Sequence, residues 1–241
     1  MKTAIKLFSL LLIIGFTSCK SDINFGKGID GSGNVITEKR NISQKFTKIS
    51  TSSGVNVILE QGSPTMVEVE TDDNLIEHVV TEVENGTLVV KIQGNISMMT
   101  SINVRIKTET ISSLESSSGS SIKSKNTING SSIALKSSSG SEIKVDLEYE
   151  SVSCESSSGS EIKASGKTLR LETKSSSGSE IDASNLAANE VYAQSTSGSS
   201  TTVNPIVKLD GKASSGSSID YIKEPKKVTK EETSGGRVDK E

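Results

Sequence analysis

Three glutamates that recur at one place in a repeated motif are the best candidates for binding chemistry in this sequence. Each stands two residues after the glycine of a Ser-Gly pair, and they are Glu142, Glu161 and Glu180. In stacked repeats the three carboxylates would form one column, which suits calcium or a sugar. The adjacent outward column carries lysines, namely Lys123, Lys144 and Lys163. We therefore expect a self-compensated charged strip, with a calcium or sugar site as the alternative.

Residue sets for catalysis are few. The one histidine, His78, cannot form a zinc site by itself. The sequence has no Gly-x-Ser-x-Gly nucleophile elbow and no phosphate-binding loop. Residues 26–31 match the dinucleotide fingerprint in form, but no strand pattern precedes them and no helix pattern follows. Lysines beside the paired carboxylates favour the ionised form, so no general acid with a raised pKa is expected. These features predict a protein that is not an enzyme and that uses no metal or cofactor.

The first cysteine follows a targeting pattern. Two lysines precede an apolar run, residues 7–16, that is too short to span a membrane, so residues 1–18 are predicted to be an export signal. The tetrapeptide Phe-Thr-Ser-Cys that ends at Cys19 resembles the end of a bacterial lipoprotein signal. This resemblance implies that Cys19 is lipidated and that the protein is anchored in the outer membrane, on either its periplasmic or its surface face. Plain secretion with an unmodified cysteine is the alternative.

The second cysteine, Cys154, lies five residues before a repeat glycine, as Leu114 and Leu135 do. It is therefore expected to be a small buried hydrophobe and not a nucleophile. With Cys19 lipidated, no intramolecular disulfide is available.

Charge and composition narrow the partners. Loss of residues 1–18 removes two of the 27 basic residues, which leaves 25 against 30 acidic residues and a net charge of about −5. This balance argues against nucleic acid and against an anionic membrane surface as partners. Residues 19–30 are polar and glycine-rich and are predicted to be a flexible tether to the lipid.

A Ser-Gly motif recurs about every 20 residues in the second half of the chain. A fixed period of this length without helical patterns is typical of a solenoid in which each repeat forms one turn. Odd positions counted from each glycine are apolar or small and even positions are polar, which predicts one strand into and one strand out of each corner. Glycine supplies the backbone freedom of the corner. The corner glycines are Gly119, Gly140, Gly159, Gly178, Gly198 and Gly216, and Gly235 marks a final polar rung that caps the stack.

The serine directly before each glycine occupies an odd position, so we expect it to point into the corner and to stack from rung to rung. A buried hydroxyl without a partner costs about 1–3 kcal/mol, so each serine needs a hydrogen bond. These serines are Ser118, Ser139, Ser158, Ser177, Ser197 and Ser215. Four residues before the glycines the charge alternates over Glu115, Lys136, Glu155 and Lys174, which predicts ion pairs between rungs that lie about 4.8 Å apart.

The first part of the chain has longer strands with clear alternation. Its strongest signal is a hairpin over residues 79–92 with Asn85-Gly86 at the turn. We predict a single all-β domain over residues 31–241, with N-terminal strands and hairpin over 31–112 and Ser-Gly repeats over 113–241. A flexible Ser/Gly linker is the alternative, and the phased isoleucines and leucines argue against it.

An ordered set of short motifs carries a family resemblance. They are Gly31-Ser32-Gly33-Asn34-Val35, Phe46-Thr47-Lys48-Ile49, Ser53-Gly54-Val55-Asn56-Val57, Asp72-Asp73-Asn74-Leu75, Asn85-Gly86-Thr87-Leu88, the Ser-Ser-Gly-Ser repeats and Thr233-Ser234-Gly235-Gly236. Together they resemble the head GIN domain family of auto-transporter adhesins, over nearly the whole mature chain. The resemblance implies a right-handed, parallel β-helix-like fold in envelope proteins of Bacteroidetes-type bacteria. It implies an adhesin and carries over no catalytic residue.

Two functions therefore stay open. The first is a non-enzymatic cell-envelope lipoprotein, an adhesin or interaction scaffold that presents a rigid solenoid surface to an envelope protein or a glycan. The alternative is a carbohydrate-binding or glycan-acting β-helix protein, which rests on analogy of fold. In either case, the outer ladders and the loops opposite the corners are the expected contact surfaces.

Overall fold

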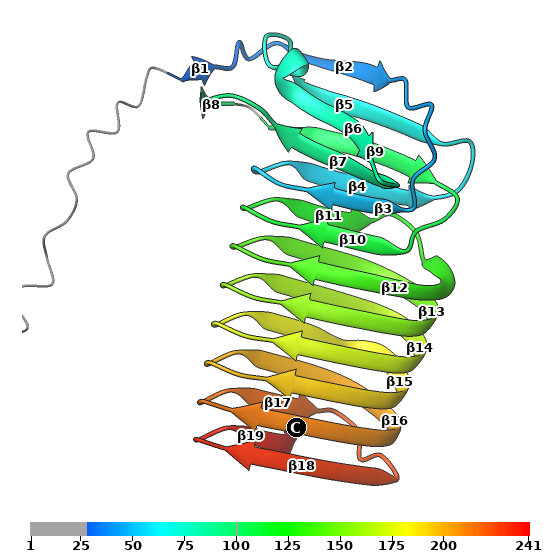
Figure 1. Cartoon of the computed structure of the whole chain (residues 1–241), viewed down its shortest axis with the longest axis vertical. Coiled ribbons are helices and arrows are strands. Elements are labelled where there is room, and N and C mark those ends of the chain that lie inside the picture. The colour runs from blue at the N-terminus through cyan, green and yellow to red at the C-terminus, as the bar shows by residue number, and fades with distance from the viewer. Residues whose placement is uncertain (1–27, 100) are drawn as a thin grey trace, which may run out of the picture.

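The computed structural model describes residues 28–99 and 101–241, which form one stack of β-rungs (Figure 1). The predicted signal, Cys19 and residues 19–27 of the predicted tether lie outside the described residues. Within the described ranges the helical structure is one 3-10 turn, η2 (Ile76–His78), and no helix is long and apolar enough to cross a membrane. The predicted all-β solenoid is confirmed.

Each solenoid rung runs into a Ser-Gly corner along one face and out of it along the other. We call these the inbound face and the outbound face. Most rungs are joined by one long strand that leaves a corner, rounds the far bend and returns to the next corner. The strands of this part are β10 (Ser113–Ser116), β11 (Ser121–Ser124), β12 (Ile128–Ser137), β13 (Glu142–Ser156), β14 (Glu161–Ser175), β15 (Glu180–Ser195), β16 (Ser200–Ser214), β17 (Ser218–Tyr221), β18 (Lys227–Thr233) and β19 (Arg237–Lys240).

Neighbouring rungs pair in parallel with matching repeat positions side by side. Ile143 lies opposite Ile162, and Ile162 lies opposite Ile181. All three are fully buried, as are most side chains at odd positions. The core is therefore a set of ladders of like residues, as the period-2 pattern predicted. The final rung marked by Gly235 also exists, as β18 and β19.

The corners differ from the prediction in one respect. Ser158 and Gly159 both have left-handed backbone, with φ of 55° and 69°, and every corner repeats this pair. Two consecutive left-handed residues turn the corner outward, so the serine before the glycine is exposed and the predicted inward stack at that position is wrong. The same correction applies to Ser118, Ser139, Ser177, Ser197 and Ser215.

The buried corner serines stand three residues before and one residue after the glycine. Ser156 and Ser160 are 1% and 2% exposed, and their hydroxyls lie 2.9 Å apart. The corner backbone also bonds between rungs, because Gly159 N donates to Ser177 O at 3.2 Å. Hydrogen bonding thus continues through the corner, and the buried serine hydroxyls have the hydrogen-bond partners that they need.

The solenoid begins earlier than the predicted boundary at residues 112 and 113. A rung around Gly54 comes from β3 (Lys48–Thr51) and β4 (Asn56–Gln61), which pair in parallel with β10 and β11. On its other side lie β7 (Thr87–Ile92) and β9 (Asn103–Thr108). β7 and β9 therefore extend the same stack by one more rung.

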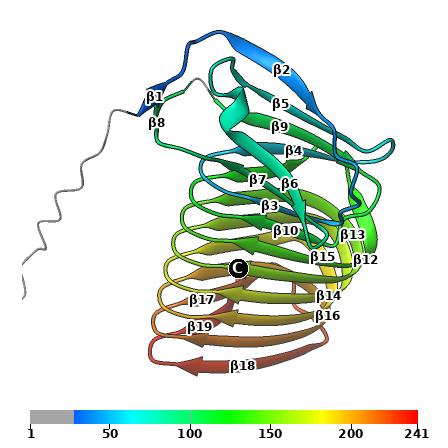
Figure 2. The ribbon, with the colours of Figure 1, turned by 45° about the horizontal axis from the view of Figure 1, so that its top comes forward.

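Antiparallel strands close the N-terminal end of the stack. On the outbound face β5 (Met66–Asp72) pairs with β9, and β2 (Val35–Arg40) pairs with β5. On the inbound face β6 (Val79–Glu84) pairs with β7, which confirms the hairpin at Asn85-Gly86. Figure 2 shows β2, β5 and β9 along one side of this end, with the helical turn η2 between them and β6. The buried Leu75 and Ile76 cover the end of the core there.

The predicted tether ends before residue 29. β1 (Ile29–Asp30) pairs in parallel with β8 (Ile96–Met98), and Ile29 N donates to Asn95 O at 2.8 Å. These two residues therefore join the domain at its N-terminal end.

Candidate functional site

The glutamate column lies on the outbound face, on three successive strands. Glu142 is opposite Glu161, and Glu161 is opposite Glu180. Lys163 Nζ lies 2.5 Å from Glu161 Oε1. This hydrogen bond and the charges of the three glutamates raise the pKa of Lys163. The lysine thus neutralises the middle of the column.

Metal binding is not supported by this arrangement. Among residues 28–99 and 101–241, no group of three or more His, Cys, Asp or Glu side chains is placed to hold a metal ion. Further along the stack the column continues with Ser200 and Ser218, whose hydroxyls lie 3.2 Å apart, and ends at Arg237. The column is a charged and polar ladder with an ammonium group among its carboxylates.

A longer polar surface crosses five rungs of the inbound face. It is a groove of about 420 Å³, which we call the inbound groove. Its floor is the buried column three residues before the glycines, and its walls are the outward columns on either side. The wall side chains are Glu155, Ser157, Lys174, Ser176, Gln194, Thr196, Lys212, Ser214, Glu231 and Thr233.

The charges of the inbound groove are partly paired. Lys212 Nζ lies 2.7 Å from Glu231 Oε2 on the next rung. At the start of the groove Lys136 reaches Glu155 at 3.6 Å, which is the predicted pairing between rungs. Lys174 instead pairs within its own strand, with Glu172 at 3.0 Å. The groove therefore offers hydroxyls, an amide and ammonium groups at intervals of about 4.8 Å.

An aromatic side chain that the sequence analysis did not identify lies beside the groove. The ring centre of Tyr192 is 4.6 Å from Arg170 Cζ and 4.5 Å from Lys208 Nζ. These two side chains come from β14 and β16, the strands on either side of β15, so the ring of Tyr192 makes a cation–π contact on each side. The sequence did hold one signal for Tyr192, because the residue stands at an even, outward position of its repeat in a chain with few aromatic residues.

The far bends carry an apolar groove of about 530 Å³, which we call the bend groove. Leu169 and Ile206 line it and are 57% and 48% exposed. Tyr149 lies there too, but its hydroxyl donates to Ile111 O at 2.8 Å, and burial raises its pKa to about 12. This surface lies opposite the corners, where contact residues were expected.

The pKa shifts resolved among the described residues come from burial, ion pairs and hydrogen bonds. Burial raises the pKa of the Cys154 thiol to about 12, so the thiol stays protonated and inert. His78 Nδ1 lies 3.2 Å from a backbone oxygen, that of Gln93. Each resolved shift moves a pKa away from neutrality. Hydrogen bonds from lysines lower the pKa of Glu60, and hydrogen bonds from Arg105 and Asn103 lower that of Glu70. Hydrogen bonds from Ser32 and Asn34 lower the pKa of Asp73. A carboxyl group that acts as a general acid near neutral pH needs the opposite shift.

The fold and sequence have known counterparts. Residues 45–225 match the family model described as "Putative auto-transporter adhesin, head GIN domain". A putative adhesin from Bacteroides fragilis has a similar structure, with a TM-score of 0.83, 20% identity and coverage of 89% of this chain and 100% of that chain. A putative lipid binding protein from Parabacteroides distasonis gives 0.73, 20% identity and coverage of 88% and 99%.

A putative adhesin from Parabacteroides merdae gives a TM-score of 0.72 at 18% identity, with coverage of 88% of this chain and 98% of that chain. Among curated proteins, no relative matches the chain. At these identities the solved structures establish the shared fold.

Proposed function

The chain belongs to the head GIN domain family, and from this premise we propose that it is a non-enzymatic adhesin that binds its partner through the inbound groove. The observation that carries the proposal is the continuity of that groove, which crosses five rungs with polar side chains at regular spacing. The partner that fits is an extended, polar polymer of the cell envelope.

Rigidity makes such a surface effective. The groove walls on β13, β14, β15 and β16 stand on strands that are hydrogen-bonded on both sides, so their spacing is fixed before the partner arrives. Preorganised contacts lose little conformational entropy on binding. Several weak contacts in a row then act together.

Carbohydrate binding is the second candidate function. It is favoured by the hydroxyl and amide side chains in the middle of the groove, Ser176, Gln194 and Thr196. These groups are the hydrogen-bonding partners that a glycan chain requires.

We also propose that the protein is exported and held in the outer membrane by a lipid on Cys19. The support is the lipoprotein-like signal that ends at this cysteine. Multiple acyl chains on one residue give stable anchoring. Residues 29–30 lie at the N-terminal end of the stack, so the lipid would hold the rod by that end.

Binding to glycan arrays and to envelope polysaccharides tests the contact surface. The soluble form is the mature chain with Cys19→Ser. The triple variant Lys174→Ala/Gln194→Ala/Lys212→Ala is expected to lose affinity at least about tenfold, or about 1.4 kcal/mol. The matched control on the outbound face, Glu142→Gln/Glu161→Gln/Glu180→Gln, is expected to bind as the wild type does.

The reverse pattern, with binding lost only in the glutamate variant, would move the contact surface to the outbound face. Release of oligosaccharide products from the same polysaccharides would contradict a non-enzymatic function.

A further inference from the structure

In the last rung the backbone N–H and C=O of Val238 face the end of the rod. Among the described residues, the strand ladder that includes β19 is the one with β17. Arg237 N donates to Ser217 O and Glu241 N donates to Tyr221 O, both at 3.1 Å. Because alternate residues of a strand direct their polar groups to opposite sides, Val238 directs its N–H and C=O away from β17.

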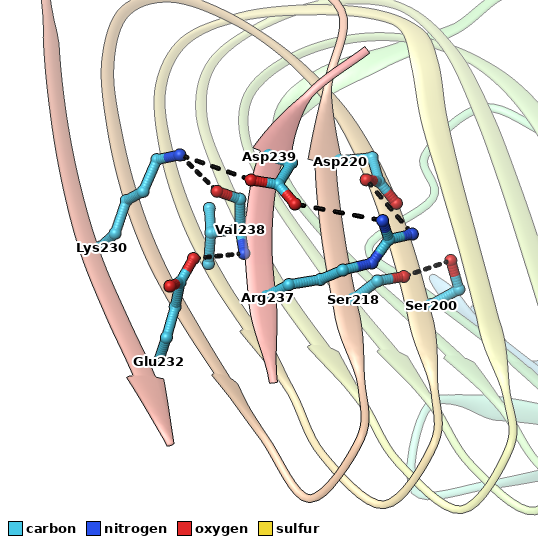
Figure 3. A network of polar contacts seen from close by, with 8 residues as sticks. All are labelled: Ser200, Ser218, Asp220, Lys230, Glu232, Arg237, Val238 and Asp239. Atoms are coloured by element: carbon cyan, nitrogen blue, oxygen red, sulfur yellow. Dashed lines mark hydrogen bonds and ion pairs between the residues drawn. The ribbon is translucent and has the colours of Figure 1, made fainter. Parts of the chain in front are cut away.

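Two side chains of β18 occupy this backbone pair. Val238 N donates to Glu232 Oε1 at 2.7 Å, and Lys230 Nζ donates to Val238 O. Figure 3 shows both side chains reaching from β18 towards β19. The carboxylate and the ammonium group thus take the places that the backbone of a further rung would take.

These two residues differ in type from the residues at the same positions of every earlier Ser-Gly rung. Lys230 stands five residues before its glycine, where other rungs have Leu114, Leu135, Cys154, Thr173, Ala193 or Gly211. Glu232 stands three residues before it, where other rungs have Ser116, Ser137, Ser156, Ser175, Ser195 or Ala213. Both columns are core columns, so only the last rung directs charge over the core.

Further contacts hold the two charges in place. Lys230 Nζ lies 5.4 Å from the centre of the Tyr221 ring and 4.0 Å from Asp239 Oδ1. Below them Val238 is fully buried although it belongs to the last rung. A Cβ on Gly211 would lie 2.9 Å from Val238 Cγ1, so the absence of a side chain at Gly211 makes room for this valine.

We propose that Lys230 and Glu232 form an end plug that prevents a second copy of this chain from adding its β-rungs to the C-terminal end. An added strand needs the N–H and C=O of Val238, and the plug already uses both. It also needs an apolar core to stack on, and the plug presents two charges there. Inward-directed charges are a known means of stopping growth at a sheet edge. A strand of a second copy could still pair with the free edge of β18, but the two copies would then share no apolar core.

Removal of the plug tests this inference by the oligomeric state. The variant Lys230→Leu/Glu232→Ser restores the residue types of the first repeat, Leu114 and Ser116. The matched control, Lys227→Leu/Glu231→Ser, makes the same changes at outward positions of the same strand. Both are compared with the wild type, each with Cys19→Ser, by light scattering and sedimentation velocity over a wide range of concentration.

We expect the wild type and the control to stay monomeric and the plug variant to double its mass as concentration rises. A plug variant that keeps its circular dichroism and stays monomeric would overturn the proposal. Equal association of the control would overturn it as well.

Amide hydrogen exchange provides a second measurement, which does not depend on the double variant. The Val238 amide should be protected in the wild type and should lose its protection in Glu232→Ala. An unprotected Val238 amide in the wild type would show that the plug does not form.

Discussion

Glycine at the residue scale is used in two ways in this chain, and both involve positive φ. At Gly159 the φ is 69°, and a Cβ built there meets nothing within 4 Å. At Gly166, on β14, the φ is 109°, and a Cβ would lie 2.0 Å from the Leu147 carbonyl oxygen on the neighbouring strand. At the corner, glycine is therefore required only because the backbone has a positive φ. At Gly166 it is also required because a side chain would clash with the neighbouring strand.

The two glycines should respond differently to alanine. Gly159→Ala is expected to lower the free energy of unfolding by about 1–2 kcal/mol, the cost of a left-handed backbone for a residue with a Cβ. Gly166→Ala is expected to cost clearly more, because the Leu147 backbone must also move. Guanidinium unfolding of the mature chain measures both. Equal losses would contradict the steric role of Gly166.

The corner, at the scale of the element, works as a joint between rungs. The Ser160 hydroxyl lies 2.7 Å from Ser137 O in the preceding rung and accepts a hydrogen bond from Ser157 N at 3.1 Å. The same contacts recur for Ser141, which lies 2.7 Å from Ser116 O. The serine after each corner glycine from Gly119 to Gly216 therefore links two rungs and completes its own turn.

This role predicts a difference between neighbouring serines of one corner. Ser160→Ala removes the hydroxyl that bonds Ser137 O, Ser157 N and the Ser156 hydroxyl, while Ser157 N keeps its hydrogen bond to Ser137 O at 3.0 Å, so the change should cost about 0.5–1.5 kcal/mol. Ser158→Ala, at the exposed position on the other side of the glycine, should have a much smaller effect. Denaturant midpoints of the two variants provide the comparison. A larger loss for Ser158→Ala would mean that the exposed serine carries the corner.

At the scale of the whole molecule the protein is a rod with two different ends. Antiparallel strands and η2 close the N-terminal end, where β1 also joins. Charged side chains cover the C-terminal end. A rod attached to a lipid by its N-terminal end would hold its length, and the inbound groove, away from the membrane.

The anchor gives a prediction at this scale. Metabolic labelling with palmitate should mark the wild-type protein in a Bacteroidetes-type host and should be lost in Cys19→Ala, because that cysteine is the only proposed site of acylation. Cys154→Ala serves as the control and should keep the label, since Cys154 is buried. An unlabelled wild type would contradict the anchor and would leave the adhesin proposal unaffected.

Much of the fold could be predicted because local and long-range signals agree. The 20-residue period places like residues in register, and the alternation of Ile162 with polar neighbours assigns its side chain to the core. Asn85-Gly86 fixed the hairpin through turn chemistry alone. The glutamate column could be predicted for the same reason, since stacking follows from the period.

Other features could not be predicted from pattern. Simple alternation placed Ser158 inside, but a left-handed pair at the corner breaks the alternation for one residue. The rung at Gly54 escaped the repeat because 65 residues separate it from Gly119, and only the pairing of β3 with β10 and of β4 with β11 reveals it. The cations around Tyr192 come from other strands, so the residues next to Tyr192 in the sequence do not indicate these contacts.

The sequence by itself determined the architecture, because a repeated period with alternating apolar residues has one economical way to bury its core. The tertiary structure alone decided which surfaces are continuous and how the stack ends. In the sequence Lys230 and Glu232 are charges at core positions of the repeat, and they become a plug only because the last turn of the coil brings them against the backbone of Val238. Such contacts depend on direction and distance across rungs, which the order of residues along the chain does not specify.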